Sequence, residues 1–236
     1  MIVSIRRACQ MALVAVLLIH GFGAVPPAFA DPAIQALEWR GVGPHVGNRG
    51  AGVAMHPTDR NVFYHAHSSG GVWKTEDAGQ YWIPITDGQI NVGPIGAIAV
   101  SPTAPDVIYI GTGEPQLRDC ATWGDGVYKS TDGGDTWTHL GLEATRHIAR
   151  VRIHPENPDI VFVAAMGHLY TTNKDRGLYK TEDGGESWEK VLYIDEKTGI
   201  IDVVLDPSDS QILYAAAYQR IRQPWKIYSH GPGGGI

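Results

Sequence analysis

Short apolar stretches separated by proline-containing turns recur along most of the chain. Four segments share this form: VAMHPTDRNVFY, IAVSPTAPDVIY, VRIHPENPDIVF and VVLDPSDSQILY, whose turn prolines are Pro57, Pro102, Pro155 and Pro207. Within each segment, β-branched and aromatic residues alternate with polar ones or form short runs bounded by Pro, Asn and Asp, which is typical of paired strands. The spacing of the prolines predicts an all-β chain that repeats a unit of about 50 residues.

A second motif repeats with the same period. Residues 75–82, 130–137 and 181–188 fit the pattern [ST]-x-D-x-G-x-x-W, which is the Asp-box. We predict a structural role for each motif residue, because Asp accepts backbone N–H bonds in a turn, Gly supplies a positive φ and Trp buries its ring between neighbouring units. The residues concerned are Asp77, Gly79 and Trp82, then Asp132, Gly134 and Trp137, and finally Asp183, Gly185 and Trp188.

The proline-containing turn and the Asp-box of each unit together predict four strands. In the second unit these strands are expected at residues 95–100, 107–111, 126–130 and 136–140. A four-stranded unit at this spacing predicts a β-propeller blade. The expected blades are residues 37–42 together with 50–87, then 93–142, 147–194 and an incomplete 199–236. Residues 37–42 repeat the outer-strand pattern, and propellers commonly use such an N-terminal strand to close the ring. Residues 235–236 match the start of a third strand, so we predict that the sequence stops inside the fourth blade; a closed four-bladed ring is the alternative.

The N-terminal 30 residues have the features of a secretory signal. Arg6 and Arg7 precede an apolar stretch that is too short to span a bilayer, and Ala28-Phe29-Ala30 fits a cleavage site. We therefore predict a mature propeller segment from residue 31 to 236, secreted or periplasmic in a bacterium, by a Sec-type route or the twin-arginine route. The formal net charge of −6 argues against nucleic acid or an anionic membrane surface as a partner. We expect no cofactor, no metal and no membrane span after signal cleavage.

Ligand-binding residues are expected at the ends of the strands opposite the Asp-boxes. The connections there between the second and third strands of each unit grow longer along the chain, and long polar loops on a rigid scaffold commonly bind ligands. The ligand-binding candidates are Arg118, Trp123, Arg146, His147, His168, Arg220, Arg222 and Trp225. The weaker candidates for a catalytic role are the carboxylic acids Glu114, Asp119 and Asp125.

Several strings in the chain resemble the Asp-box propellers grouped with sortilin-type (Vps10) domains, particularly their bacterial secreted relatives. The strings are WRGVGP, SSGGVWKTEDAGQYW, GTGEP, WGDGVYKSTDGGDTW and GLYKTEDGGESWEKVLYIDE. Asp-boxes also occur in sialidases and in xyloglucan-cleaving glycoside hydrolases with paired propellers. The resemblance therefore implies the fold and leaves both binding and enzymatic functions open.

The resemblance to xyloglucan-cleaving enzymes implies a catalytic Asp in the first blade, and that position falls on Ser68 in this chain. A serine is no carboxylate base, and glycosidic cleavage generally needs two carboxyl groups. We therefore prefer a secreted binding scaffold that presents its loops to a peptide or glycan, with Trp123 and Trp225 stacking and the arginines engaging carboxylates. The alternatives are a glycoside hydrolase, xyloglucanase-like or sialidase-like, with part of its site C-terminal to this chain, and a propeller that docks a further C-terminal domain.

Overall fold

The structure is a computed structural model that describes residues 49–116, 118 and 120–236. In this part of the chain, regular structure consists of strands and one short 3-10 turn, Glu143–Thr145, so the prediction of an all-β propeller fold is confirmed. The predicted signal segment, the predicted outer strand at residues 37–42 and Asp119 lie outside the described residues. No helix among the described residues has the length and apolar content needed to cross a membrane.

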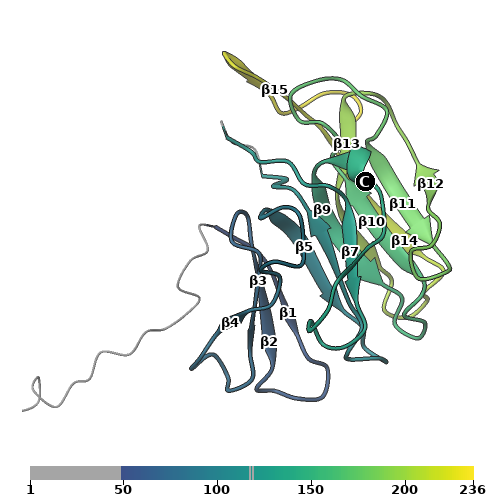
Figure 1. Cartoon of the computed structure of the whole chain (residues 1–236). Helices are drawn as coiled ribbons and strands as arrows, with labels where there is room; N and C mark the ends of the chain where they lie inside the picture. The colour runs from purple at the N-terminus through teal and green to yellow at the C-terminus, as the bar shows by residue number, and fades with distance from the viewer. Residues whose placement is uncertain (1–48, 117, 119) are drawn as a thin grey trace, which may run out of the picture. The chain divides into compact units, whose positions relative to one another are not determined.

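Three four-stranded antiparallel sheets follow one another along the chain, each a simple meander (Figure 1). The first sheet contains β1 (Gly50–Met55), β2 (Phe63–His67), β3 (Val72–Thr75) and β4 (Ile83–Pro84). The second contains β5 (Ile95–Val100), β6 (Ile108–Thr112), β7 (Val127–Ser130) and β8 (Thr138–His139). The third contains β9 (Ile148–Ile153), β10 (Val161–Ala165), β11 (Gly177–Thr181) and β12 (Glu189–Leu192).

A fourth unit begins with the antiparallel pair β13 (Thr198–Leu205) and β14 (Leu213–Gln219). A separate hairpin follows, made of β15 (Ile221–Gln223) and β16 (Lys226–Tyr228). Beyond it, Gly235 forms an antiparallel bridge with Ala217 of β14. That position matches Gly177, which pairs with Ala165 at the start of the third strand of the third sheet. The chain thus reaches the place of a third strand in its fourth unit.

The apolar side chains are buried between neighbouring sheets. One cluster joins the first and second sheets and includes Tyr64 and Ile108; another joins the second and third and includes Tyr109 and Val163. A smaller cluster joins the third sheet to the β13–β14 pair. Because both faces of β6 are covered, all five of its residues are buried, which explains why its sequence IYIGT has no polar face.

The three Asp-box turns share one set of hydrogen bonds. The backbone N–H groups of Tyr81, Thr136 and Ser187 each donate to the motif aspartate at 2.9 Å. Hydrogen bonds lower the pKa of the Asp132 carboxyl to about 2, the largest contribution coming from the Thr136 hydroxyl. The motif glycines Gly79, Gly134 and Gly185 have φ angles of 90°, 99° and 102°, which are unfavourable for other residues. The carboxylates of these turns are therefore used within the turns.

Two of the three Asp-box tryptophans connect their own sheet to the sheet before it. The indole N–H of Trp137 donates to the Ile85 carbonyl at 2.8 Å, and that of Trp188 donates to the Leu140 carbonyl at the same distance. The indole of Trp82 instead donates to the Gly79 carbonyl of its own turn. Trp137 and Trp188 thus each add a hydrogen bond to the apolar packing between sheets.

Hydrogen bonds between turns assign the loops to two opposite ends of the sheets. At one end the Asp-box turns bond to the turns between first and second strands, as in Gly133 N–H to the Asp106 carbonyl at 2.9 Å. At the other end the remaining connections bond to one another, as in Gly71 N–H to the Gly93 carbonyl at 3.0 Å. We call this second end the loop face.

Candidate functional site

One long connection dominates the loop face, the loop from Gly113 to Gly126 between β6 and β7. Its backbone is fixed from neighbouring sheets, since Gly113 N–H donates to the Pro94 carbonyl at 2.8 Å and Gly124 N–H donates to the Arg146 carbonyl at 2.7 Å. The Tyr170 hydroxyl reaches the Ala121 carbonyl at 3.1 Å from the third sheet. These three hydrogen bonds tie the described ends of the loop to the neighbouring sheets.

Glu114 is held inside this loop and is only 1% exposed. Its Oε1 accepts hydrogen bonds from Nε and Nη2 of Arg49, at 2.9 and 2.5 Å, and Nε of Arg118 lies 3.4 Å away. Two guanidinium groups therefore share one buried carboxylate. Burial and these contacts shield the carboxylate from a glycosidic oxygen, so its geometry is that of a structural anchor.

Asp125 is also engaged within the fold. Its Oδ2 accepts a hydrogen bond from the Tyr128 hydroxyl at 2.7 Å, and its backbone N–H donates to the Thr112 hydroxyl at 2.8 Å. Burial, followed by this bond to Asp125, raises the pKa of the Tyr128 phenol to about 12. Glu114 and Asp125, two of the three acids that the sequence suggested for a catalytic role, are thus both held by hydrogen bonds within the fold.

Trp123 and Arg146 do come together on the loop face. The Trp123 side chain is 57% exposed, and the Arg146 guanidinium lies over its ring, 4.6 Å from the ring centroid. A guanidinium on an indole face is an attractive cation–π arrangement. Trp123 lies in the β6–β7 loop and Arg146 in the connection from β8 to β9, so the stacked pair is a product of the fold, and its exposed indole is available to a ligand.

The two predicted histidines lie in different environments. His147 is 1% exposed and its Nδ1 pairs with the Gly167 carbonyl at 2.9 Å. Nε2 of His168 pairs with the Ala144 carbonyl at 3.0 Å and lies 3.6 Å from the Asp175 carboxylate. His147 is therefore part of the interior, whereas His168 links two loops at the surface.

Burial of His147 predicts an acid-dependent loss of stability. Desolvation lowers the pKa of its imidazole to about 4, against about 6.5 in the unfolded chain. The unfolded state therefore binds the extra proton more readily between these values. We expect up to about 3 kcal/mol of stability to be present above pH ~6.5 and lost as the pH falls to ~4. Urea unfolding at several pH values across this range measures how the free energy of unfolding depends on pH.

The matched variant for this experiment is His147→Asn, which removes the titrating group. Its unfolding free energy should change less between neutral pH and pH ~4 than that of the parent protein. An identical pH slope in the two proteins would show that other groups control the acid response.

The predicted arginines of the fourth unit differ from one another. Arg220 is 2% exposed and donates from Nη1 to the Pro115 carbonyl at 2.6 Å. Arg222 donates its backbone N–H to the Leu169 carbonyl at 2.7 Å. Trp225, at the tip of the β15–β16 hairpin, is 79% exposed. Arg220 thus reaches the Glu114 loop from another unit, while Trp225 presents its ring to solvent.

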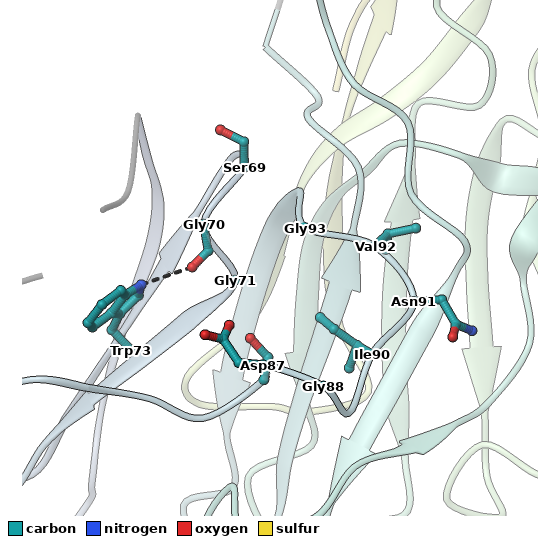
Figure 2. Close-up of a pocket in the computed structure, with 11 residues that line it drawn as sticks. Ser69, Gly70, Gly71, Trp73, Asp87, Gly88, Ile90, Asn91, Val92 and Gly93 are labelled. Carbon is teal, nitrogen blue, oxygen red and sulfur yellow. Dashed lines mark hydrogen bonds between the residues drawn. The ribbon is translucent and has the colours of Figure 1, made fainter. Parts of the chain in front are cut away.

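A cavity of about 480 Å³ opens on the loop face at the first sheet (Figure 2). Two segments line it, residues 69–73, which connect β2 to β3 and enter β3, and residues 86–93, which connect β4 to β5. Figure 2 shows the Asp87 carboxylate beside the Gly70–Trp73 backbone, where the Trp73 indole N–H donates to the Gly70 carbonyl at 2.9 Å. Asp87, Asn91 and Ser69 are its exposed polar side chains, and Trp73 and Ile90 supply apolar surface.

Among the described residues, Asp87 is the single carboxylate that lines this cavity. Ser68, where the family resemblance implies a catalytic Asp, is next to the lining segment but only 1% exposed. Sequence reasoning missed Asp87 and Asn91 because it followed loop length and so weighted the longer connections. The available signal was the run TDGQINVGP, rich in Gly, Asn and Asp, between two strands.

The described residues contain no group of three His, Cys, Asp or Glu side chains that could hold a metal ion. The loop face carries a polar cavity, the exposed rings of Trp123 and Trp225, and the Arg146 side chain. Such an arrangement suits recognition of a polar organic ligand, since pockets combine apolar walls with a few placed polar groups.

Comparisons with known proteins agree with this architecture. The chain is 26% identical over 195 residues to a xyloglucanase of a Paenibacillus species and 28% identical over 204 residues to a xyloglucanase of Hypocrea jecorina. These matches cover 77% and 80% of the chain but 18% and 22% of the relatives, so the chain spans about a fifth of their length.

Among solved structures, a GH74 xyloglucanase from Xanthomonas campestris matches with a TM-score of 0.57 and 23% identity. The match covers 76% of this chain and 29% of that structure, and it supports the propeller fold. The family model for sortilin, neurotensin receptor 3, matches residues 70–220, which is more than half of the chain. The chain therefore belongs to the Sortilin-Vps10 family of β-propellers.

Proposed function

We propose that the protein binds and acts on a polysaccharide as a propeller of the glycoside hydrolase type, with xyloglucan as the first substrate to test. The observation that carries this proposal is the likeness to xyloglucanases over about four-fifths of the chain. It favours the glycoside hydrolase alternative over the binding scaffold preferred from sequence alone. The predicted export signal is consistent with a polymer outside the cytoplasm.

The cavity of residues 69–93 is the proposed place for one sugar unit. Trp73 and Ile90 would contact the apolar face of the sugar, while Asp87 and Asn91 would hydrogen-bond its hydroxyl groups. The volume of about 480 Å³ lies within the usual range for small-ligand pockets. The exposed Trp123 ring offers a second contact for a longer chain on the same face.

Hydrolysis would make a further demand on the site. Glycosidases generally use two carboxyl groups that flank the scissile bond, and this cavity has Asp87 alone among the described residues. A second carboxyl group would have to come from another part of the full-length protein. This is compatible with a chain that spans about a fifth of the xyloglucanases' length.

Binding without cleavage is the second candidate function. The observation in its favour is that Glu114 and Asp125, the predicted acids that the structure describes, are both held in internal hydrogen bonds. A site with one available carboxylate can recognise a glycan without cleaving it. The two functions predict the same ligand and differ in whether new reducing ends appear.

The test measures xyloglucan binding and reducing-end release by the full-length protein, with Asp87→Asn beside it. We expect the variant to bind about tenfold more weakly, because it loses a charge-assisted hydrogen bond to a sugar hydroxyl. The matched control is Glu186→Gln, an acid-to-amide change on the exposed Asp-box turn of the third sheet. Reducing-end release that depends on Asp87 would support hydrolysis, and binding without release would support the second candidate. Absence of both on xyloglucan and related β-glucans would overturn the proposal.

A further inference from the structure

Arg146 has a backbone conformation that an L residue rarely adopts. Its φ is 54° and its ψ is −35°, and the His147 N–H bonds the Thr145 carbonyl at 2.5 Å across it. A γ-turn of this hand, with a positive φ at its centre, is rare and strained. Among the described residues, twelve positions with a positive φ are glycine and three, Ala78, Leu142 and Arg146, are not. Glycine is thus what such a backbone ordinarily selects in this chain.

The backbone at this position needs no side chain. The Arg146 carbonyl accepts the Gly124 N–H at 2.7 Å, and a glycine would offer the same carbonyl with less strain. What arginine adds is the guanidinium, which lies 4.6 Å from the centroid of the Trp123 ring. That guanidinium forms no hydrogen bond and no ion pair with the described residues, so the indole is the partner that the fold provides for it. Strain that persists at one position often serves function.

Trp123 gains a fixed orientation from this contact. The residue is 57% exposed, and an exposed indole otherwise moves among several rotamers. A ring that is already held loses less conformational freedom when a ligand stacks on it, so binding is stronger. The stacked pair also neighbours the cavity of residues 69–93, because the Tyr128 hydroxyl accepts from the Asn91 N–H at 3.4 Å and donates to Asp125 at 2.7 Å. Asp125 lies two residues after Trp123 in the same loop.

We propose that Arg146 is a positioning residue, kept in a strained turn because its guanidinium holds the Trp123 ring as a platform for a second sugar unit. The inference rests on the proposed glycan-binding function and adds to it a residue that acts through Trp123 without touching the sugar. A glycan chain with one unit in the cavity would place a later unit on the indole, whose apolar face suits the C–H groups of a neutral sugar. Arg146 then contributes to affinity through the orientation of that ring.

The experiment measures xyloglucan binding by the full-length protein in a double-mutant cycle of Arg146→Gly and Trp123→Ala. We expect Trp123→Ala to weaken binding about tenfold and Arg146→Gly about fivefold. The double variant should bind no more weakly than Trp123→Ala alone, because Arg146 acts through the ring. Arg146→Lys keeps a cation beside the indole and should recover part of the loss. The matched control is Arg60→Gly, the same change in an exposed turn at the opposite end of the sheets, which should leave binding unchanged.

Urea unfolding of Arg146→Gly should give a midpoint no lower than that of the parent protein, since glycine relieves the strain. Weaker binding by this variant, with that midpoint and with no further loss in the Trp123→Ala background, supports the inference. An equal loss with and without Trp123, a lower midpoint, or unchanged binding overturns the positioning role. If Asp87→Asn weakens binding while Arg146→Gly and Trp123→Ala do not, this inference fails and the proposed function stands. Absence of binding to xyloglucan and related β-glucans by the parent protein overturns both.

Discussion

Replacing Gly113 with alanine is expected to lower the free energy of unfolding by about 3 to 5 kcal/mol, because backbone strain and overpacking add. Gly113 has a φ of 89°, which an L side chain rarely adopts. A Cβ there would also overlap the Arg146 carbonyl oxygen and meet Gly124 N at 2.9 Å. Both obstacles are backbone atoms, so a change of side-chain rotamer cannot relieve them. Urea unfolding of parent and variant measures the difference.

Gly141→Ala is the control for this experiment. Gly141 also has a positive φ, 82°, but a Cβ there meets nothing within 4 Å. The Gly141→Ala variant should lose about 1 kcal/mol of unfolding free energy, so the comparison separates backbone strain from steric overlap. Equal effects in the two variants would show that the loop of residues 113–126 can shift away from Arg146. That result would contradict the close backbone packing of Gly113 against Arg146 and Gly124.

Local pattern predicted the sheets well because strand pairing within a blade is local. The first strand predicted for the second unit, residues 95–100, coincides with β5, and the strand predicted at 126–130 corresponds to β7 at Val127–Ser130. The outer strand was predicted at 136–140 but pairs only over Thr138–His139. Outer strands have one neighbour within their sheet, so their pairing ends sooner than the apolar pattern suggests.

The candidate sites could be predicted only in part because they join distant segments. Loop length directed attention to the face that carries Trp123, Arg146 and Arg220. It could not show that Arg49, 65 positions earlier, holds Glu114, or that Arg220, 105 positions later, bonds to Pro115. These contacts depend on how sheets stack, and no periodicity within one unit encodes them.

The same contacts change the interpretation of the predicted residues. Glu114 looked like a catalytic acid because it lies in a polar loop, but its burial beside Arg49 and Arg118 makes it an anchor. Asp87 was not among the predicted residues because it lies in the β4–β5 connection, but it is the described carboxylate that lines the cavity at the first sheet. The solvent exposure of each carboxylate and its hydrogen-bond partners distinguish the two residues, and the sequence shows neither property directly.

Replacing Trp137 with alanine is expected to cost about 3 to 5 kcal/mol of unfolding free energy. The ring packs against the apolar cluster between the first and second sheets, and its N–H bonds the Ile85 carbonyl at 2.8 Å. Alanine leaves a cavity at a junction that joins two sheets, and the Ile85 carbonyl keeps only the longer hydrogen bond from the Gln89 side-chain amide at 3.3 Å. Since neighbouring repeats stabilise one another through such interfaces, urea unfolding should also show weaker coupling between the first sheet and the rest.

Two further variants separate the causes of this loss. Trp137→Phe keeps most of the apolar ring surface but removes the short indole hydrogen bond to the Ile85 carbonyl, which still accepts from Gln89 at 3.3 Å, so the variant should lose about 1 kcal/mol of unfolding free energy. Trp225→Ala removes an equally large side chain that is 79% exposed, and its effect should stay within about 0.5 kcal/mol. A large loss from Trp225→Ala would mean that the hairpin tip packs against the fold. A small loss from Trp137→Ala would mean that the sheets are joined chiefly by the aliphatic cluster, and the structural role assigned to the Asp-box tryptophan would then be wrong.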